Sequence, residues 1–115
     1  MAAAEKQAWE TVCQQSDLVP GSGVAALVGH EQIALFYLPN EQQQIFAISN
    51  RDPIGCANVL SRGIVGDIDG ELVVASPLYK QHFSLTSGVC LEDLDVHIEV
   101  YDARLEGNEV LIARR

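Results

Sequence analysis

The sequence has 115 residues, of which 48% are hydrophobic and 20% charged, and its formal net charge is −9. A chain of this length buries about two-thirds of its surface around one core, and its ordinary composition excludes disordered, collagen-like and low-complexity proteins. The excess of acidic residues argues against nucleic acids and anionic membranes as partners, because both attract basic surfaces. The charge is more typical of a solubilising surface than of a steering field.

Short runs of apolar and β-branched residues, separated by glycine and proline, predict strands in the first half of the chain. The expected strands are residues 9–13, 24–28, 33–38 and 45–48, and the last two form a hairpin that turns near Asn40. Residues 49–63 show no strand-length alternation, and residues 57–61 within them suggest a single helical turn.

The second half of the chain continues the same pattern of short strands. Strands are expected at residues 64–65, 72–75, 81–85 and 89–91, with residues 66–70 (GDIDG) as a turn. Residues 96–104 alternate as one strand and form a hairpin with residues 110–113. Nine or ten short strands and no amphipathic helix indicate an all-β sandwich or barrel. The expectation is one domain over residues 1–115, in which residues 1–8 suit a flexible N-terminus.

Features of the termini and the cysteines favour a cytoplasmic protein. The N-terminus lacks the basic and apolar regions of a signal peptide, and residues 18–30 are too short and too rich in glycine for a membrane helix. The three cysteines, Cys13, Cys56 and Cys90, are far apart and contain no C-x-x-C pair. They are therefore interpreted as small buried residues rather than as a disulfide or metal ligands.

A search for catalytic constellations in the sequence finds little. The histidines His30, His82 and His97 are scattered, and a solvated surface is the favoured interpretation for His30 and His97. Asp67 and Asp69 stand in a stretch that is too short for a calcium loop, so a plain turn is expected there. We therefore predict no catalytic residue in this chain.

Two loop motifs nevertheless resemble those of Rieske iron–sulfur domains. Residues 76–91, SPLYKQHFSLTSGVCL, are similar to the second ligand loop, in which C-P-x-H precedes a strand with F-x-L and then a glycine. Asp52-Pro53-Ile54 follows a predicted strand, as the first ligand loop, C-x-H, does. The resemblance implies a Rieske-like sandwich of small antiparallel sheets, which agrees with the strand pattern.

The four ligand positions of this motif carry the wrong residues for a cluster. They are Asp52, Ile54, Ser76 and Tyr79, whereas a Rieske [2Fe–2S] cluster needs two cysteines on one iron and two histidines on the other. Isoleucine has no donor atom, and serine and tyrosine are hard oxygen donors. The sequence therefore predicts that the chain binds no cluster, no metal and no other cofactor.

Further stretches are similar to one branch of this family, the small subunits of bacterial assimilatory NAD(P)H-dependent nitrite reductases. They are residues 48–53 (ISNRDP), 57–63 (ANVLSRG) and 74–80 (VASPLYK), and Trp9 followed by Val12-Cys13. The resemblance implies a non-catalytic subunit with a structural or regulatory role. It also implies a large subunit that carries FAD, sirohaem and an iron–sulfur cluster and reduces nitrite to ammonium.

A docking surface for the large subunit is predicted at the two loops. Three of the seven basic residues, Arg51, Arg62 and Lys80, lie in or beside the loops of an otherwise acidic chain. Pro77 and Tyr79 would add an apolar and aromatic anchor, a residue class that is enriched at interface hot spots. The alternative is that the loops are only stable turns and that their charges are only solvated.

Two other functions remain open on the residues alone. An autonomous Rieske-type electron carrier is opposed by the missing ligands. A small binding module would hold a ligand or a metal ion with Asp52 and His82, which are fewer than the three or four ligands of a typical metal site. Iron content and colour of the purified chain would separate these functions from that of a cluster-free subunit.

Overall fold

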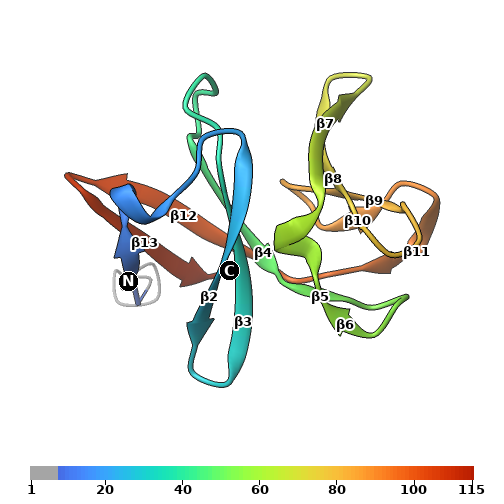
Figure 1. Ribbon diagram of the computed structural model, residues 1–115, viewed down its shortest axis with the longest axis horizontal. Helices are drawn as coiled ribbons and strands as arrows, with labels where there is room; N and C mark the ends of the chain where they lie inside the picture. Colours follow the sequence, from blue (N-terminus) through green and yellow to red (C-terminus); the bar gives the residue numbers. More distant parts are fainter. Residues whose placement is uncertain (1–7) are drawn as a thin grey trace, which may run out of the picture.

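The computed structural model describes residues 8–115, and these fold into antiparallel β-sheets (Figure 1). The flexible N-terminus expected for residues 1–8 lies outside the described residues, apart from Ala8. The larger sheet has the strand order β1-β13-β12-β4-β3-β2. Its strands are β1 (Glu10–Gln14), β2 (Ser22–Val28), β3 (Glu31–Tyr37), β4 (Ile45–Ser49), β12 (Val100–Glu106) and β13 (Glu109–Arg114).

The second sheet contains five strands in the order β11-β10-β9-β8-β7. Its strands are β7 (Ile64–Ile68), β8 (Glu71–Ala75), β9 (His82–Ser84), β10 (Val89–Cys90) and β11 (Asp93–His97). A small ribbon pairs β5 (Arg51–Asp52) with β6 (Ala57–Asn58), and two 3-10 turns, η1 (Gln15–Asp17) and η2 (Leu60–Arg62), complete the elements. The described residues form no helix long and apolar enough to span a membrane.

Strands β3 and β4 stand between two cores, because successive side chains of a strand point to opposite faces. In β3, Ala34 and Phe36 join the core between the two sheets, while Ile33 and Leu35 join a second core on the other face of the larger sheet. The β4 residues alternate between the same two cores. This is why residues 33–36 and 45–48 are continuously apolar in sequence and fully buried in the fold.

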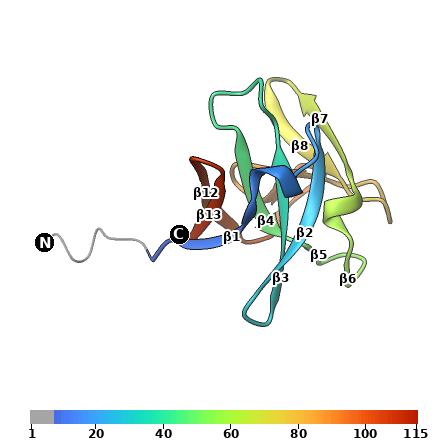
Figure 2. The ribbon, with the colours of Figure 1, turned by 60° about the vertical axis from the view of Figure 1, so that its left-hand side comes forward.

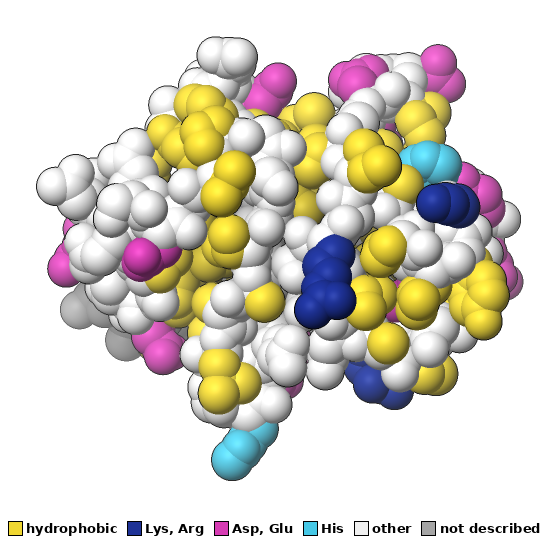
Figure 3. Space-filling view, viewed as in Figure 1, with side chains coloured by type: hydrophobic (Ala, Val, Ile, Leu, Met, Phe, Trp, Pro, Cys, Tyr) yellow, Lys and Arg dark blue, Asp and Glu magenta, His cyan; other side chains and the backbone are white. Residues whose placement is uncertain are grey.

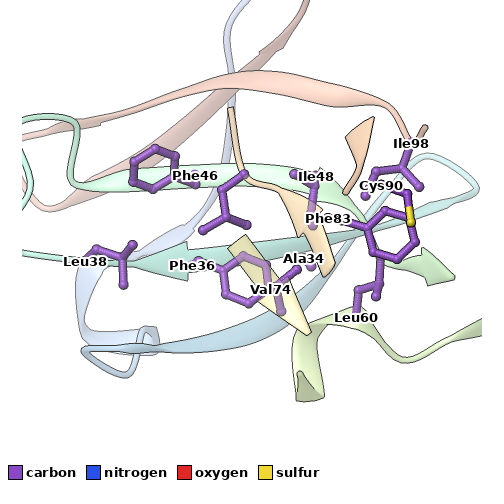
Figure 4. Close-up of a cluster of buried hydrophobic side chains, with 11 residues drawn as sticks. Ala34, Phe36, Leu38, Phe46, Ile48, Leu60, Val74, Phe83, Cys90 and Ile98 are labelled. Atoms are coloured by element: carbon purple, nitrogen blue, oxygen red, sulfur yellow. The ribbon is translucent and has the colours of Figure 1, made fainter. Parts of the chain in front are cut away.

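The core between the sheets supports the segments that follow β4 and β8. In Figure 4, Phe83 of β9 lies beside Cys90 and Ile98, and Leu60 of η2 points toward it. All four side chains are at most 7% exposed. Burial of Leu60 fixes η2 over the core between the sheets, beside β2 and β3, and burial of Phe83 fixes the start of β9.

The expected single strand over residues 96–104 is wrong, because the chain changes sheets inside it. Residues 93–97 form β11 beside β10, whereas β12 begins at Val100 and pairs with β4 and β13. Between them Ile98 is buried in the core between the sheets, and its N–H donates to the Gly88 carbonyl at 2.9 Å. An uninterrupted alternation does not reveal a change of pairing partner.

Other differences concern short elements. Thirteen strands are present in the described residues instead of nine or ten, partly because β5, β6 and β10 have only two residues each. The turn expected over residues 66–70 is narrower, since β7 continues to Ile68 and only Asp69 and Gly70 turn the chain. The helical turn is η2, three residues later than expected at its start.

Gly88 lies close to the backbone of Ile98, where the chain passes from the second sheet to the larger sheet. Its φ is +80°, and an added Cβ would lie 2.2 Å from the Ile98 carbonyl oxygen. We expect Gly88→Ala to lower the free energy of unfolding by about 2 kcal/mol, because strained φ and a backbone clash add together. Urea unfolding measures this loss.

Gly70 is the matched control for that variant. Its φ is +87°, but an added Cβ would meet no atom within 4 Å. Gly70→Ala therefore isolates the cost of the left-handed backbone, and we expect it to lose only about 1 kcal/mol. Equal losses in the two variants would contradict the role given to the Ile98 contact.

Candidate functional site

The two loops that carry the ligand positions lie against each other. The first loop, residues 52–56, starts at the last residue of β5 and leads into β6, and the second loop, residues 76–81, connects β8 to β9. The Ser76 hydroxyl donates a hydrogen bond of 2.5 Å to Oδ2 of Asp52 and so joins the loops directly. Leu78 also lies over Gly55, where an added Cβ would meet its Cδ1 at 2.3 Å.

Asp52 organises the first loop around a fully buried carboxylate. Its Oδ1 accepts hydrogen bonds from the backbone N–H groups of Ile54 (2.8 Å) and Gly55 (3.0 Å). Its backbone carbonyl accepts the N–H of Cys56 at 2.7 Å. An Asp side chain that binds the N–H two residues onward is a common way to close a turn. With Ser76 on Oδ2, both carboxylate oxygens have partners, as a buried charge requires.

Ser76 has the corresponding role in the second loop, and it too is fully buried. Its N–H donates to the Gln81 carbonyl at 2.9 Å, and its carbonyl accepts the N–H of Lys80 at 3.1 Å. Its hydroxyl oxygen accepts the N–H of Leu78 at 3.3 Å while the hydroxyl donates to Asp52. Asp52 and Ser76 therefore each accept backbone hydrogen bonds that close their own loop, and the hydrogen bond between them joins the two loops.

Asn50 anchors the base of the first loop and is 1% exposed. Its Oδ1 accepts the N–H of Ser61 at 2.7 Å, and its Nδ2 donates to the side chain of Gln32 at 3.0 Å. Its backbone carbonyl accepts the N–H of Leu60 at 3.0 Å. These bonds hold the entry to the first loop against η2 and β3, so the position of Asp52 follows from packed elements.

The donor atoms at the four ligand positions do not fit a Rieske cluster. Asp52 and Ser76 are bonded to each other, Ile54 offers no donor, and Tyr79 offers only a phenol oxygen. His82, the other candidate ligand, instead places its Nδ1 2.6 Å from Glu92. Within residues 8–115, no group of three or more His, Cys, Asp and Glu side chains is arranged to hold a metal ion.

The four ligand positions divide into a buried pair and an exposed pair. The two cysteine positions, Asp52 and Ser76, are 0% exposed and face each other. The two histidine positions, Ile54 and Tyr79, are 37% and 64% exposed. The buried pair thus forms a polar contact between the loops, and the exposed pair adds apolar and aromatic area to the surface.

Basic and apolar side chains gather on the surface around the loops. Figure 3 shows dark-blue Lys and Arg side chains around a group of hydrophobic ones, on the right half of the face seen in Figure 1. We define the loop face by its exposed residues. They are Arg51, Ile54, Arg62, Pro77, Leu78, Tyr79 and Lys80.

The cations of the loop face differ from the other cations of the described chain. Arg51, Arg62 and Lys80 form no ion pair with any described residue. The remaining arginines pair with carboxylates at 2.5 to 2.9 Å, in the pairs Arg104–Glu106, Arg114–Glu31 and Arg115–Asp102. Among residues 8–115, the lysine and arginine side chains without an ion pair are therefore those of the loop face.

The cysteines agree only in part with the expectation that all three are buried. Cys90 is buried and Cys13 is half-buried, but Cys56 is exposed in the first loop. Cys56 has a φ of +57° because the chain turns sharply after Gly55 to enter β6. All three are free thiols, so no disulfide joins the loops.

A polar cluster beside β12 contains Tyr101, Glu31 and Arg114. The hydroxyl of the buried residue Tyr101 donates to Oε1 of Glu31 at 3.0 Å, and Arg114 donates to the same oxygen at 2.5 Å. Burial and the bond to Glu31 raise the pKa of Tyr101 to about 12. The bonds from Arg114 and Tyr101 lower the pKa of Glu31. His30 is exposed at the neighbouring β2–β3 turn, and His97 is exposed on β11, as expected.

The raised pKa of Tyr101 gives a stability that depends on alkaline pH. Above the ordinary value of 10.0, the unfolded chain releases this proton while the folded chain retains it until about pH 12. The free energy of unfolding should therefore fall as the pH rises through this interval. Urea unfolding of the wild-type chain and of Tyr101→Phe at several alkaline pH values measures the difference. The interpretation is wrong if both chains show the same pH dependence.

Sequence reasoning missed Ile54 and Leu78 as surface residues of the site. It treated Ile54 only as a lost ligand, and it gave Leu78 no role. Both are large apolar side chains in a loop, at least 37% exposed. In both loop motifs a large apolar residue directly follows the proline, as Ile54 follows Pro53 and Leu78 follows Pro77. An apolar residue at this place in a loop is a sequence signal that could have identified both as surface residues.

Comparison with known proteins places this geometry in a family. Residues 8–113 match the Rieske-like [2Fe-2S] domain family. The nitrite reductase (NADH) small subunit of Salmonella typhimurium is 49% identical over 102 residues, which cover 89% of this chain and 94% of that protein. A crystal structure of a putative NADH-dependent nitrite reductase small subunit from Mycobacterium tuberculosis has a TM-score of 0.86 and 42% identity, covering 96% of this chain and 97% of that chain.

A third relative is a much larger protein. The nitrite reductase [NAD(P)H] large subunit of Klebsiella oxytoca contains a stretch that is 36% identical over 112 residues, which cover 92% of this chain but 11% of that protein. The family match spans nearly the whole described chain, and the closely matching small subunits are of its own length. The chain therefore belongs to the Rieske-like domain family, in the branch of the nitrite reductase small subunits.

Proposed function

We propose that this chain is the small, non-catalytic subunit of a cytoplasmic NAD(P)H-dependent nitrite reductase that reduces nitrite to ammonium. Its role there is structural or regulatory. The observation that carries the proposal is that the chain has a Rieske-like fold without the donors of a Rieske cluster. Neither thiolate nor imidazole is present at the four expected ligand positions, which are Asp52, Ile54, Ser76 and Tyr79. A chain without these donors has no means of its own to carry the electrons of the reaction.

The cofactors of the reaction are assigned to the large subunit. The family resemblance implies FAD, sirohaem and an iron–sulfur cluster there, and none of them in this chain. The Klebsiella oxytoca large subunit supports a physical association, because a domain similar to this chain is part of the same polypeptide. In the present protein the corresponding association would be formed between two separate chains.

We assign docking on the large subunit to the loop face. Tyr79 and Pro77 supply exposed aromatic and apolar area, and Leu78 and Ile54 extend it. Arg51, Arg62 and Lys80 surround that area without an ion pair in residues 8–115. Apolar anchors within a ring of charge are typical of protein interfaces, and the positive sign fits an acidic patch on the partner.

The experiment is co-expression of tagged chain and large subunit, followed by purification and a nitrite-reduction assay. We expect the two chains to co-purify in a defined ratio and the assay to lose activity or stability when the small chain is omitted. A large subunit that retains full activity and stability alone, and does not bind this chain, would contradict the proposal.

The isolated chain provides a second, independent test. We expect anaerobically purified chain to lack visible absorption and stoichiometric iron, and to show no turnover of nitrite or NAD(P)H, because the ligand positions hold no thiolate or imidazole. Elemental analysis and absorption spectroscopy measure this. Two irons per chain with charge-transfer bands would instead favour the autonomous electron carrier, and one stoichiometric metal ion would favour the binding module.

A further inference from the structure

We propose that the hydrogen bond between Asp52 and Ser76 takes the mechanical place of the iron–sulfur cluster, and that it positions the loop face for the large subunit. In a Rieske centre each loop supplies one cysteine and one histidine, so the cluster ties the loops together. Here the residues at the two cysteine positions bond to each other at 2.5 Å. The part of this inference that concerns the partner rests on the proposed function.

The local hydrogen bonds connect this bridge to the surface residues. The Asp52 carboxylate that accepts the Ser76 hydroxyl also accepts the N–H of Ile54, and the Ser76 hydroxyl also accepts the N–H of Leu78. Ile54 and Leu78 are both exposed members of the loop face. A shift of either bridging side chain would therefore move the backbone that carries an anchor of the docking surface.

Burial makes the bridge necessary for the loops to stay together. Asp52 and Ser76 are 0% exposed, so water does not replace a missing partner without opening the loops. Loss of the Ser76 hydroxyl would leave Oδ2 of Asp52 without its donor, and an unpaired buried charge is far more costly than an unpaired neutral group. The cheapest response is separation of the loops, which would lift Leu78 from Gly55.

The variants for the test are Ser76→Ala, Asp52→Asn and a matched control, Ser84→Ala. Ser84, the last residue of β9, is also a buried serine, and its hydroxyl donates to the Glu71 carboxylate and accepts the N–H groups of Thr86 and Ser87. It lies outside both loops. The control therefore removes the same atom from a similar hydrogen-bond network without touching the loop face.

Two measurements are made on each chain: amide hydrogen exchange at Ile54, Gly55 and Leu78, and the Kd for the purified large subunit. We expect Ser76→Ala to speed exchange at these amides and to weaken binding about 10-fold or more, the scale of one hydrogen bond to a charged group. Asp52→Asn should stay within about 3-fold of wild type, because its Oδ1 keeps both backbone bonds and its amide can donate to the Ser76 oxygen. Ser84→Ala should bind as wild type does.

The outcomes separate this inference from the proposed function. If the wild-type chain does not bind the large subunit, the proposed function fails, and the exchange data on the isolated chain still decide whether the bridge holds the loops. Unchanged loop exchange in Ser76→Ala overturns the bridge, and equal losses of affinity in Ser76→Ala and Ser84→Ala overturn its specific role in docking. If Ser76→Ala does not fold, Ser76→Cys, with its weak thiol donor, replaces it with an intermediate expected effect.

Discussion

The double variant Tyr79→Ala/Lys80→Glu is expected to bind the large subunit about 100-fold more weakly than the wild-type chain, a change of about 2.7 kcal/mol. Tyr79 is 64% exposed on the loop face, and truncation of an aromatic that acts as an interface hot spot costs about 2 kcal/mol or more. Lys80 forms no ion pair with a described residue, so reversing its charge acts on the partner instead of breaking an internal contact.

The measurement is a titration of the large subunit with each chain at fixed ionic strength, since salt screens the exposed charges. Circular dichroism first checks that the fold is unchanged. The control is Leu94→Ala/Arg104→Glu, which also removes an exposed large apolar residue and reverses one charge, in this case a charge that pairs with Glu106 and lies over the Trp9 ring. Leu94 lies on β11 and Arg104 on β12, outside the loop face. If both double variants bind equally, or the loop variant retains wild-type affinity, the docking face lies elsewhere.

Phe83→Ala is expected to lower the free energy of unfolding by about 4 kcal/mol, the largest effect on stability proposed for this chain. The Phe83 ring is 0% exposed in the core between the sheets, and its strand pairs with both Val74 and Cys90. Removing the ring leaves a cavity that packed strands on both sides are unable to close.

A graded series of substitutions checks the cause. Phe83→Leu keeps most of the volume and should lose about 1.5 kcal/mol, while Leu27→Ala at a 71% exposed site should change stability by less than about 0.5 kcal/mol. Urea unfolding measures the free energy of unfolding of all three variants. Its dependence on urea concentration should be the same for each of them if unfolding remains two-state. Equal losses in Phe83→Ala and Phe83→Leu would exclude cavity formation as the cause.

The loops show how far sequence reasoning reached. The motifs around Asp52 and Ser76 identified the two loops that the structure brings together, because a motif is a local pattern. The hydrogen bond between the two residues was not predicted, since they are 24 residues apart and nothing local shows that they meet. The exposure of Ile54 and Leu78 was missed for the same reason, because the burial of a loop side chain depends on which distant segments pack over the loop.

Strand prediction also succeeded only where the signal is local in sequence. Residues 33–36 and 45–48 were recognised because their apolar runs are continuous, and the structure buries every one of them. The break at Ile98 was missed, since a strand that leaves one sheet for another keeps its alternation. Strands β5 and β6 are defined only by their pairing with each other, so two residues of sequence contain no signal for them.

The pairing of β1 with β13 has a consequence for engineering. Glu10 lies opposite Ile112 in an antiparallel register, and both strands stand on the side of the molecule away from β5 and β6 (Figure 2). A short linker could therefore join the end of β13 to the start of β1 in a circular permutant, with the chain opened at the exposed Gly107–Asn108 turn. The same arrangement lets a fluorophore, a surface tether or a whole neighbouring domain be attached before β1 or after β13 while the loops remain accessible.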